Sequence, residues 1–239
     1  MGESLVRFPI IYLLKELAQT HLHRAGAGIL PHPHSKGEDL QTSTFIYYWA
    51  LAHRDPSSGV QVVNVTEYYD DRDDDSSIWY KSLVPRYRCL QSRDLPAGAK
   101  VGFKYQSTTV NPSMFLPWIK KRLDERGVRF ARREVSSIDE ARIILGMDVL
   151  VNASGLGAYN IAHDEKVHPI RGQTMLVESD LEQMVLFQGS HYTYQIPRMN
   201  SGGVIIGGVA QEGNLDPEPD ASVKDRHPEA DEPGSAASV

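Results

Sequence analysis

Small residues that follow an apolar segment are the part of this sequence best suited to chemistry. Residues 148–152, Asp-Val-Leu-Val-Asn, run directly into Ala153-Ser154-Gly155-Leu156-Gly157. A buried parallel strand that ends in small residues lets a nucleotide approach the backbone, because no side chain blocks the way. The pattern predicts a nucleotide-binding strand at 148–152, followed by its turn. No Gly-x-Gly-x-x-Gly motif, which would hold a pyrophosphate, occurs near the N-terminus.

Two further groups of polar residues could suggest a metal. The acidic run 70–75 lacks the glycine and the distal glutamate of a calcium-binding loop, so we expect a solvated acidic loop. A group of histidines is interleaved with prolines and lacks distal ligands, which favours surface histidines and no metal site. Its members are His21, His23, His32 and His34.

Composition indicates an ordinary globular protein. The chain has 239 residues, 41% of them hydrophobic, and a net charge of -6, which argues against a nucleic-acid partner. The single cysteine, Cys89, excludes an intrachain disulfide framework and fits a reducing compartment. An apolar run at 8–14 is followed at once by Lys15 and Glu16, so we expect neither a signal peptide nor a membrane span. We expect an amphipathic helix around 13–18 instead.

The elements that must position these residues alternate between helix and strand in the first part of the chain. Periodicity predicts helices at 44–52, 113–124 and 137–144, and strands at 60–66, 128–135 and 148–152. Residues 172–208 contain strand patterns alone, which predicts a mostly antiparallel sheet. The expected fold class is α/β, with an incomplete first domain at 1–171 and a β region at 172–212. The acidic, proline-rich residues 213–239 predict disorder.

Several segments, taken in order over roughly residues 24 to 214, resemble the D-amino-acid oxidase family of FAD-dependent oxidases, which includes the D-aspartate oxidases. One is the strand and turn at 148–155 described above. The others are Ala25-Gly26-Ala27-Gly28-Ile29-Leu30-Pro31, Val110-Asn111-Pro112, Arg171-Gly172-Gln173, Tyr194-Gln195-Ile196-Pro197-Arg198 and Val204-Ile205-Ile206-Gly207-Gly208. The resemblance implies a partial FAD-binding Rossmann-like layer and a mostly antiparallel substrate-side sheet.

The resemblance also implies site residues. Tyr194 falls where the family places a tyrosine that meets the substrate carboxylate, and no protein acid or base is obligatory for catalysis. The family's carboxylate-binding arginine and its phosphate-binding loop have no counterpart here, so the chain looks truncated at both ends. We do not carry the arginine's role onto Arg198. The residues expected to contact FAD are Ala25, Gly26, Ala27, Gly28, Val135, Ser154 and Gly155.

The reaction implied by the resemblance is oxidation of a D-amino acid or related amine, with hydride transfer to flavin N5 and reoxidation by O2. The products would be a 2-oxo acid, ammonia and H2O2. The alternative is a non-catalytic remnant, or a fragment that binds a partner. We expect a small-molecule substrate, no nucleic acid and no membrane, and leave the oligomeric state open. The chain ends Ala237-Ser238-Val239, so a cytoplasmic or peroxisomal location is expected without a C-terminal peroxisomal signal.

Overall fold

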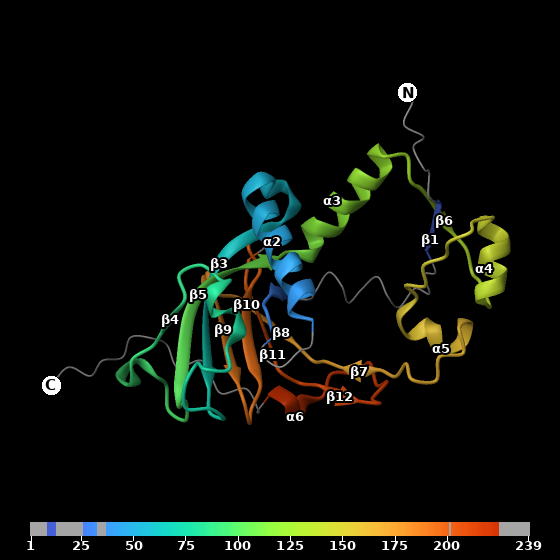
Figure 1. Ribbon diagram of the computed structural model, residues 1–239. Helices are drawn as coiled ribbons and strands as arrows, with labels where there is room; N and C mark the ends of the chain where they lie inside the picture. Colours follow the sequence, from blue (N-terminus) through green and yellow to red (C-terminus); the bar gives the residue numbers. More distant parts are fainter. Residues whose placement is uncertain (1–8, 13–25, 33–36, 201, 225–239) are drawn as a thin grey trace.

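The computed structural model describes residues 9–12, 26–32, 37–200 and 202–224. Strands and helices both contribute substantially to its secondary structure, as Figure 1 shows. The strands are β1 (Pro9–Tyr12), β2 (Ala27–Ile29), β3 (Val60–Tyr69), β4 (Arg88–Cys89), β5 (Val101–Val110), β6 (Arg129–Arg132), β7 (Ile170–Arg171), β8 (Met175–Val177), β9 (Gln183–Gln188), β10 (Thr193–Pro197), β11 (Val204–Gly207) and β12 (Gln211–Glu212).

The helices lie in the connections between these strands. The α-helices are α2 (Glu38–Arg54), α3 (Pro112–Glu125), α4 (Ile138–Leu145), α5 (Ala158–Ile161) and α6 (Ala221–Lys224). Short 3-10 turns are η2 (Pro56–Ser58), η3 (Trp79–Ser82), η4 (Ser92–Asp94) and η5 (Gly155–Gly157). No helix in the described part of the chain is long and apolar enough to cross a membrane.

One curled sheet organises the molecule. Its strands run in the order β2-β5-β3-β9-β10-β11-β8, with β4 paired to β5. All of these neighbours are antiparallel except β3 and β9, which are parallel over residues 64–69 and 183–188. The mixed α/β fold with a mostly antiparallel sheet is thereby confirmed. The strands expected at 172–208 join β3 and β5 in the same sheet.

Alternation along β3 explains how the sheet acquires its core. Val63, Val65 and Tyr69 lie on one face and are almost completely buried. The helix α2 covers this face, which we call the inner face, with Phe45 and Trp49. Aromatic and branched residues from β5, β9, β10 and the connection 70–87 complete the cluster: Ile78, Tyr80, Val84, Val101, Phe103, Tyr105, Met184, Leu186 and Ile196.

Local capping explains where the two longer helices after β5 begin. Asn111 precedes α3, accepts a hydrogen bond from the Ser113 backbone N–H at 3.1 Å, and is followed by proline at the first helical position. Ser137 caps α4 by accepting from the Glu140 N–H at 3.1 Å. Both helices match their predicted ranges closely.

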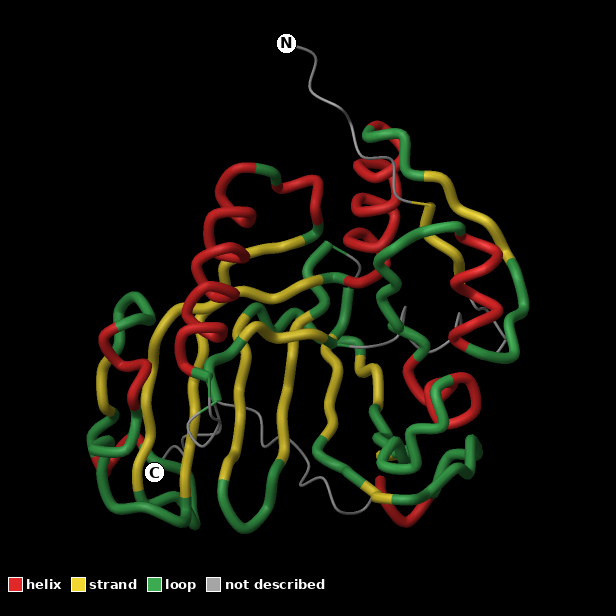
Figure 2. The backbone as a smooth tube through the Cα atoms, turned by 45° about the vertical axis from the view of Figure 1, so that its right-hand side comes forward, coloured by secondary structure: helices red, strands yellow, loops and turns green. Residues whose placement is uncertain are grey.

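Residues 129–162, which we call the helical lobe, lie on the far side of α3 from the sheet (Figures 1 and 2). Here β6 pairs in parallel with β1, the pairing type expected in a nucleotide-binding layer. The predicted strand at 148–152 is wrong: the segment pairs with no strand among the described residues. Val149 and Val151 are 74% and 82% exposed. A strand needs a hydrogen-bonded neighbour, which apolar pattern alone does not supply.

The backbone after β12 is held by the motif at 171–173. Arg171 donates from Nε to the Asp216 carbonyl at 2.7 Å, and Gln173 exchanges two hydrogen bonds with the Asp220 backbone, each 2.8 Å. These contacts order residues up to α6 within the stretch expected to be disordered. Residues 225–239, and the helix expected around 13–18, lie outside the described part of the chain.

Candidate functional site

The first part of the candidate site is the backbone of residues 26–29, which runs along the edge of the sheet. β2 pairs with β5. Two β5 side chains also donate hydrogen bonds to backbone carbonyl groups of β2. Ser107 Oγ donates to the Ile29 carbonyl, and Thr109 Oγ1 donates to the Ala27 carbonyl at 3.1 Å. Because these backbone groups are hydrogen-bonded to β5, the position of the chain at the start of β2 is fixed relative to the inner face.

Glycine lets this edge segment pack closely against β9, β10 and β11, which face it across the curled sheet. A Cβ atom on Gly26 would lie 2.9 Å from Ile205 Cβ and 3.2 Å from Ile196 Cβ, so the backbone packs directly against β10 and β11. A Cβ on Gly28 would lie 2.7 Å from the terminal methyl group of Met184 on β9. Close packing within the protein therefore favours small residues here. The sequence analysis had explained them only as residues that contact the cofactor.

Tyr194, the predicted substrate residue, projects from the same inner face. It sits opposite Gly207 in the β10–β11 register, and a Cβ on Gly207 would lie 2.3 Å from the tyrosine hydroxyl. Partial burial raises the pKa of Tyr194, so the hydroxyl stays a hydrogen-bond donor at neutral pH. Ile196 follows on this face, two residues along. The structure thus places Gly26 against Ile196, two residues along β10 from Tyr194, although Gly26 and Tyr194 are far apart in sequence.

The other predicted cofactor residues form a second group in the helical lobe. Val135 is buried just after β6, and Gly155 begins η5 with a positive φ of 57°. Ser154 donates its hydroxyl to Asn152 Oδ1 at 2.7 Å and keeps its lone pairs available. The neighbouring elements β6 and α5 lie apart from β10, which carries Tyr194 (Figure 1). Ala25 lies outside the described residues.

A buried carboxyl group on the inner face was missed by sequence reasoning. Glu67 accepts hydrogen bonds at Oε2 from the hydroxyls of Tyr80, at 2.7 Å, and Tyr69, at 3.3 Å. Burial raises the pKa of Glu67, and the tyrosine hydrogen bonds oppose this only in part. The alternation that buries Val63 and Val65 places Glu67 on the same face, which was the available signal.

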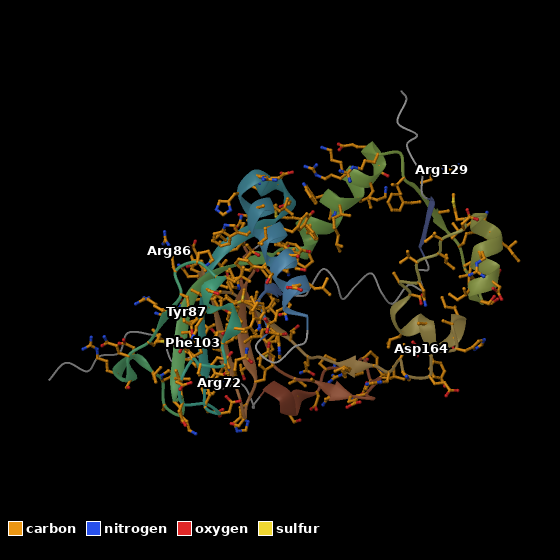
Figure 3. All side chains as sticks on the ribbon, in the orientation of Figure 1. Arg72, Arg86, Tyr87, Phe103, Arg129 and Asp164 are labelled. Carbon is orange, nitrogen blue, oxygen red and sulfur yellow. The ribbon has the colours of Figure 1, made fainter. Side chains whose placement is uncertain are left out.

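The strand registers align Glu67 with Tyr194. Glu67 pairs with Phe103 on one side and Leu186 on the other, and Leu186 pairs with Tyr194. One row therefore crosses the inner face from β5 to β10. Phe103 is the β5 member of this row, and the Tyr87 ring stacks on it with ring centroids 5.6 Å apart. Arg129, by contrast, lies in the helical lobe (Figure 3).

A cavity of about 620 Å³ lies on the opposite, outer face of the sheet. Its walls include Tyr68, Val185, Phe187 and Ile206, which alternate with the inner-face residues, together with Pro96 of the connection before β5. Tyr194 borders the cavity, but its ring packs on the inner face against the core. In the described ranges, no group of three or more His, Cys, Asp or Glu side chains could hold a metal ion.

Comparison with known sequences relates this fold to flavin enzymes. The model of the DAO family, described as FAD dependent oxidoreductase, matches residues 17–230. A D-amino-acid oxidase from Rubrobacter xylanophilus is 35% identical over 180 residues, which cover 74% of this chain and 53% of the relative. The D-aspartate oxidase of Homo sapiens is 27% identical over 182 residues, covering 74% and 52%. The chain spans about half the length of these relatives.

Solved structures show the same fold at low sequence identity. The L-proline dehydrogenase from P. horikoshii superposes with a TM-score of 0.61 at 13% identity, covering 86% of this chain and 64% of that one. An L-amino acid deaminase from Proteus vulgaris gives a TM-score of 0.57 at 8% identity, covering 91% and 64%. Because the family model matches residues 17–230, most of this chain, the chain belongs to the DAO family of FAD dependent oxidoreductases.

Proposed function

We propose that this chain contributes the flavin-facing and substrate-facing parts of an FAD-dependent D-amino-acid oxidase. One observation carries the proposal: the Gly26 backbone packs against Ile196 and Ile205, which flank Tyr194 and Gly207 on adjacent strands. A cofactor lying along residues 26–28 would therefore lie next to an amino acid bound at Tyr194.

The residues present fit an FAD molecule that spans the two groups. The segment Gly26, Ala27 and Gly28 carries no side chain larger than a methyl group, so a flat ring could lie along the side of its backbone that does not pack against Ile205 and Met184. Gly155 has open space around its Cα, and the Ser154 hydroxyl can accept a hydrogen bond, as the distal end of a dinucleotide requires. When bound, FAD supplies the hydride acceptor.

The chain's own residues orient the substrate and exclude water. The Tyr194 hydroxyl donates a hydrogen bond to the substrate carboxylate, a charge-assisted contact. Leu186, Ile196 and Ile205 line the inner face with apolar side chains, which keeps the reacting carbon away from bulk water. Oxidation of a D-amino acid here would release ammonia and a 2-oxo acid after hydrolysis, with H2O2 formed from O2.

Spectroscopy and peroxide release test this proposal. Purified protein is mixed with FAD, desalted, and examined for visible flavin absorbance. The flavin-loaded protein is then assayed for H2O2 with D-alanine, D-aspartate and L-alanine. We expect retained flavin and peroxide from a D-isomer only. Tyr194→Phe should raise KM roughly ten- to 150-fold, since a hydrogen bond to a charged group contributes about 1.5 to 3 kcal/mol. Colourless protein with no peroxide release contradicts the proposal.

Exposed apolar residues in the helical lobe favour a second candidate, a fragment that binds a partner. Besides Val149 and Val151, Ile143 of the same lobe is 81% exposed. Apolar surface of this kind marks interaction sites in other proteins. Under this alternative, Val149→Ser with Val151→Ser would abolish association with a second polypeptide in sedimentation experiments, and added FAD would have no effect on unfolding.

A further inference from the structure

The turn between β9 and β10 is tied to the end of β3 by one carboxylate. Ser190 N–H donates to Asp70 Oδ1 at 2.9 Å, and the Ser190 hydroxyl donates to Asp70 Oδ2. These two bonds hold the pKa of Asp70 below its usual range. Asp70 therefore stays ionised and keeps both acceptors at neutral pH.

Two glycines allow the turn to approach its neighbours this closely. Gly189 has φ of 108°, and a Cβ there would lie 1.9 Å from Asp70 Oδ1. On the other side of the turn, Gly208 has φ of 148°, and a Cβ there would lie 2.2 Å from the Tyr192 carbonyl oxygen. The turn is thus in close contact with the end of β3 on one side and with the end of β11 on the other.

The turn 189–192 carries a second tyrosine, Tyr192, beside the proposed substrate residue Tyr194. The Tyr192 ring centroid lies 5.7 Å from that of Tyr194, with the rings tilted by 51°. Partial burial raises the pKa of Tyr192, and Tyr194 and Glu67 add to this effect. The ring is 47% exposed, so neighbouring side chains alone do not fix it.

We propose that Asp70 is a positioning residue, which holds the turn 189–192 closed so that Tyr192 forms a fixed wall of the substrate site next to Tyr194. The substrate part of this inference rests on the proposed function. A glycine-containing turn without such an anchor samples open states at little free-energy cost, and each open state moves Tyr192 away. Holding the wall in place removes that ordering cost from substrate binding.

Proteolysis tests whether Asp70 holds the turn 189–192 closed, an interaction we call the clamp, and needs no cofactor. Chymotrypsin cleaves after exposed aromatic residues, so its cutting rate after Tyr192 in the native protein reports opening of the turn. We expect Asp70→Ala and Gly189→Ala to be cut there at least about tenfold faster than the unmodified protein, because each loses the close contact. Equal rates would overturn the proposal.

Matched controls separate the clamp from general effects of the substitutions. Asp74→Ala removes another loop carboxylate that accepts a backbone N–H, from Ser76 at 2.9 Å. Gly98→Ala substitutes another glycine of positive φ, 86°, whose Cβ would meet nothing within 4 Å. Both should leave cleavage after Tyr192 unchanged. A similar acceleration in these controls would mean that the turn opens through overall destabilisation, which also overturns the proposal.

Kinetics of the FAD-loaded protein test the substrate wall. With D-alanine, Asp70→Ala should raise KM about tenfold and leave kcat within about twofold, because ground-state binding is lost and the chemistry is not. Ser190→Ala, which keeps the backbone bond, should give an intermediate KM. An unchanged KM in a variant that is cleaved faster would overturn the proposal that Tyr192 forms a wall of the substrate site. If the unmodified protein neither binds FAD nor turns over, the proposed function fails, while the cleavage rates still decide the clamp.

Discussion

At the scale of single residues, close approaches of glycine backbone set the geometry of the candidate site. Gly26 and Gly207 sit against side chains from other strands, where a Cβ would overlap with Ile205 or Tyr194. Neither requirement depends on a bound cofactor. The sequence predicted small residues near 26 for cofactor approach, but the need for close packing only becomes visible once β2, β10 and β11 are placed.

Gly26→Ala should lower the free energy of unfolding by about 1 to 3 kcal/mol, because the added methyl group overpacks against Ile205 and Ile196. Urea denaturation measures this change. Gly157→Ala serves as the control, since its Cβ would make only ordinary contact with Ser154, at 3.4 Å. It should leave stability unchanged or raise it slightly. Equal effects from both substitutions would contradict the steric explanation.

The buried Glu67 predicts an unusual pH dependence of stability. Its pKa is raised in the folded protein, so between the ordinary glutamate pKa and the raised value the folded state binds more protons than the unfolded state. Stability should therefore fall as pH rises through this window. Glu67→Gln should abolish that slope, measured as unfolding free energy from about pH 4.5, near the ordinary glutamate value, upwards.

An exposed glutamate of opposite shift provides the control for Glu67. Hydrogen bonds from Ser136 lower the pKa of Glu140, so its contribution is present above the ordinary pKa and is lost as pH falls. Glu140→Gln should therefore leave the neutral-pH slope intact. A slope that persists in Glu67→Gln would assign the effect to another group.

At the scale of elements, the sequence predicted those whose pattern is local and missed what depends on pairing. The helices at α2, α3 and α4 and the strands β3, β9, β10 and β11 were all predicted, because their periodicity and caps lie within short segments. The strand expected at 148–152 was wrong, since its apolar alternation says nothing about a neighbour. The parallel pairing of β3 with β9 was likewise invisible in the sequence.

Asp55 links the end of α2 to α3 and predicts acid sensitivity of that junction. It accepts hydrogen bonds from Trp118 Nε1 at 2.9 Å and from Arg122 at 2.6 Å. Hydrogen bonds from Ser57, Trp118 and Arg122 hold its pKa well below the usual range. The stabilisation is complete above the ordinary aspartate pKa and is lost as pH falls through the folded value.

Asp55→Ala should therefore lower the unfolding temperature at neutral pH and shrink the loss of stability on acidification. Thermal unfolding followed by circular dichroism at neutral and acidic pH measures both effects. Asp124→Ala is the matched control, because the Asp124 carboxylate forms an exposed ion pair with Lys120 on the same helix, at 2.6 Å. A larger temperature change in Asp124→Ala would contradict the assignment of the junction to Asp55.

At the scale of the whole molecule, a well-packed sheet is joined to a helical lobe with little buried surface of its own. The lobe exposes Ile143, Val149 and Val151, whereas the strands of the sheet bury most of their inner-face side chains. The two groups of predicted cofactor residues are divided between these parts. The sequence placed both groups in one binding region, and their separation follows from the tertiary arrangement alone.

Hydrogen exchange should reveal this unevenness. Backbone amides of β3 and β5 should exchange slowest, near the rate of global unfolding, and those of residues 148–157 should exchange fastest. Mass spectrometry of proteolytic fragments measures the rates. If the proposed function holds, added FAD should slow exchange at 153–157 and at 26–29, and an equal concentration of free riboflavin should spare 153–157. Uniform protection in the absence of FAD would contradict the unequal packing.

The parallel pairing of β3 with β9 also has a consequence for synthesis on the ribosome. β3 pairs with β5 early, but its other edge has no partner until residues 183–188 emerge. That delay spans roughly 120 residues, or about 6 to 24 seconds at typical translation rates. During this interval an apolar strand edge remains open to pairing with other nascent chains. Chaperone capture of the first half of the chain would then govern how much of the protein reaches its folded form.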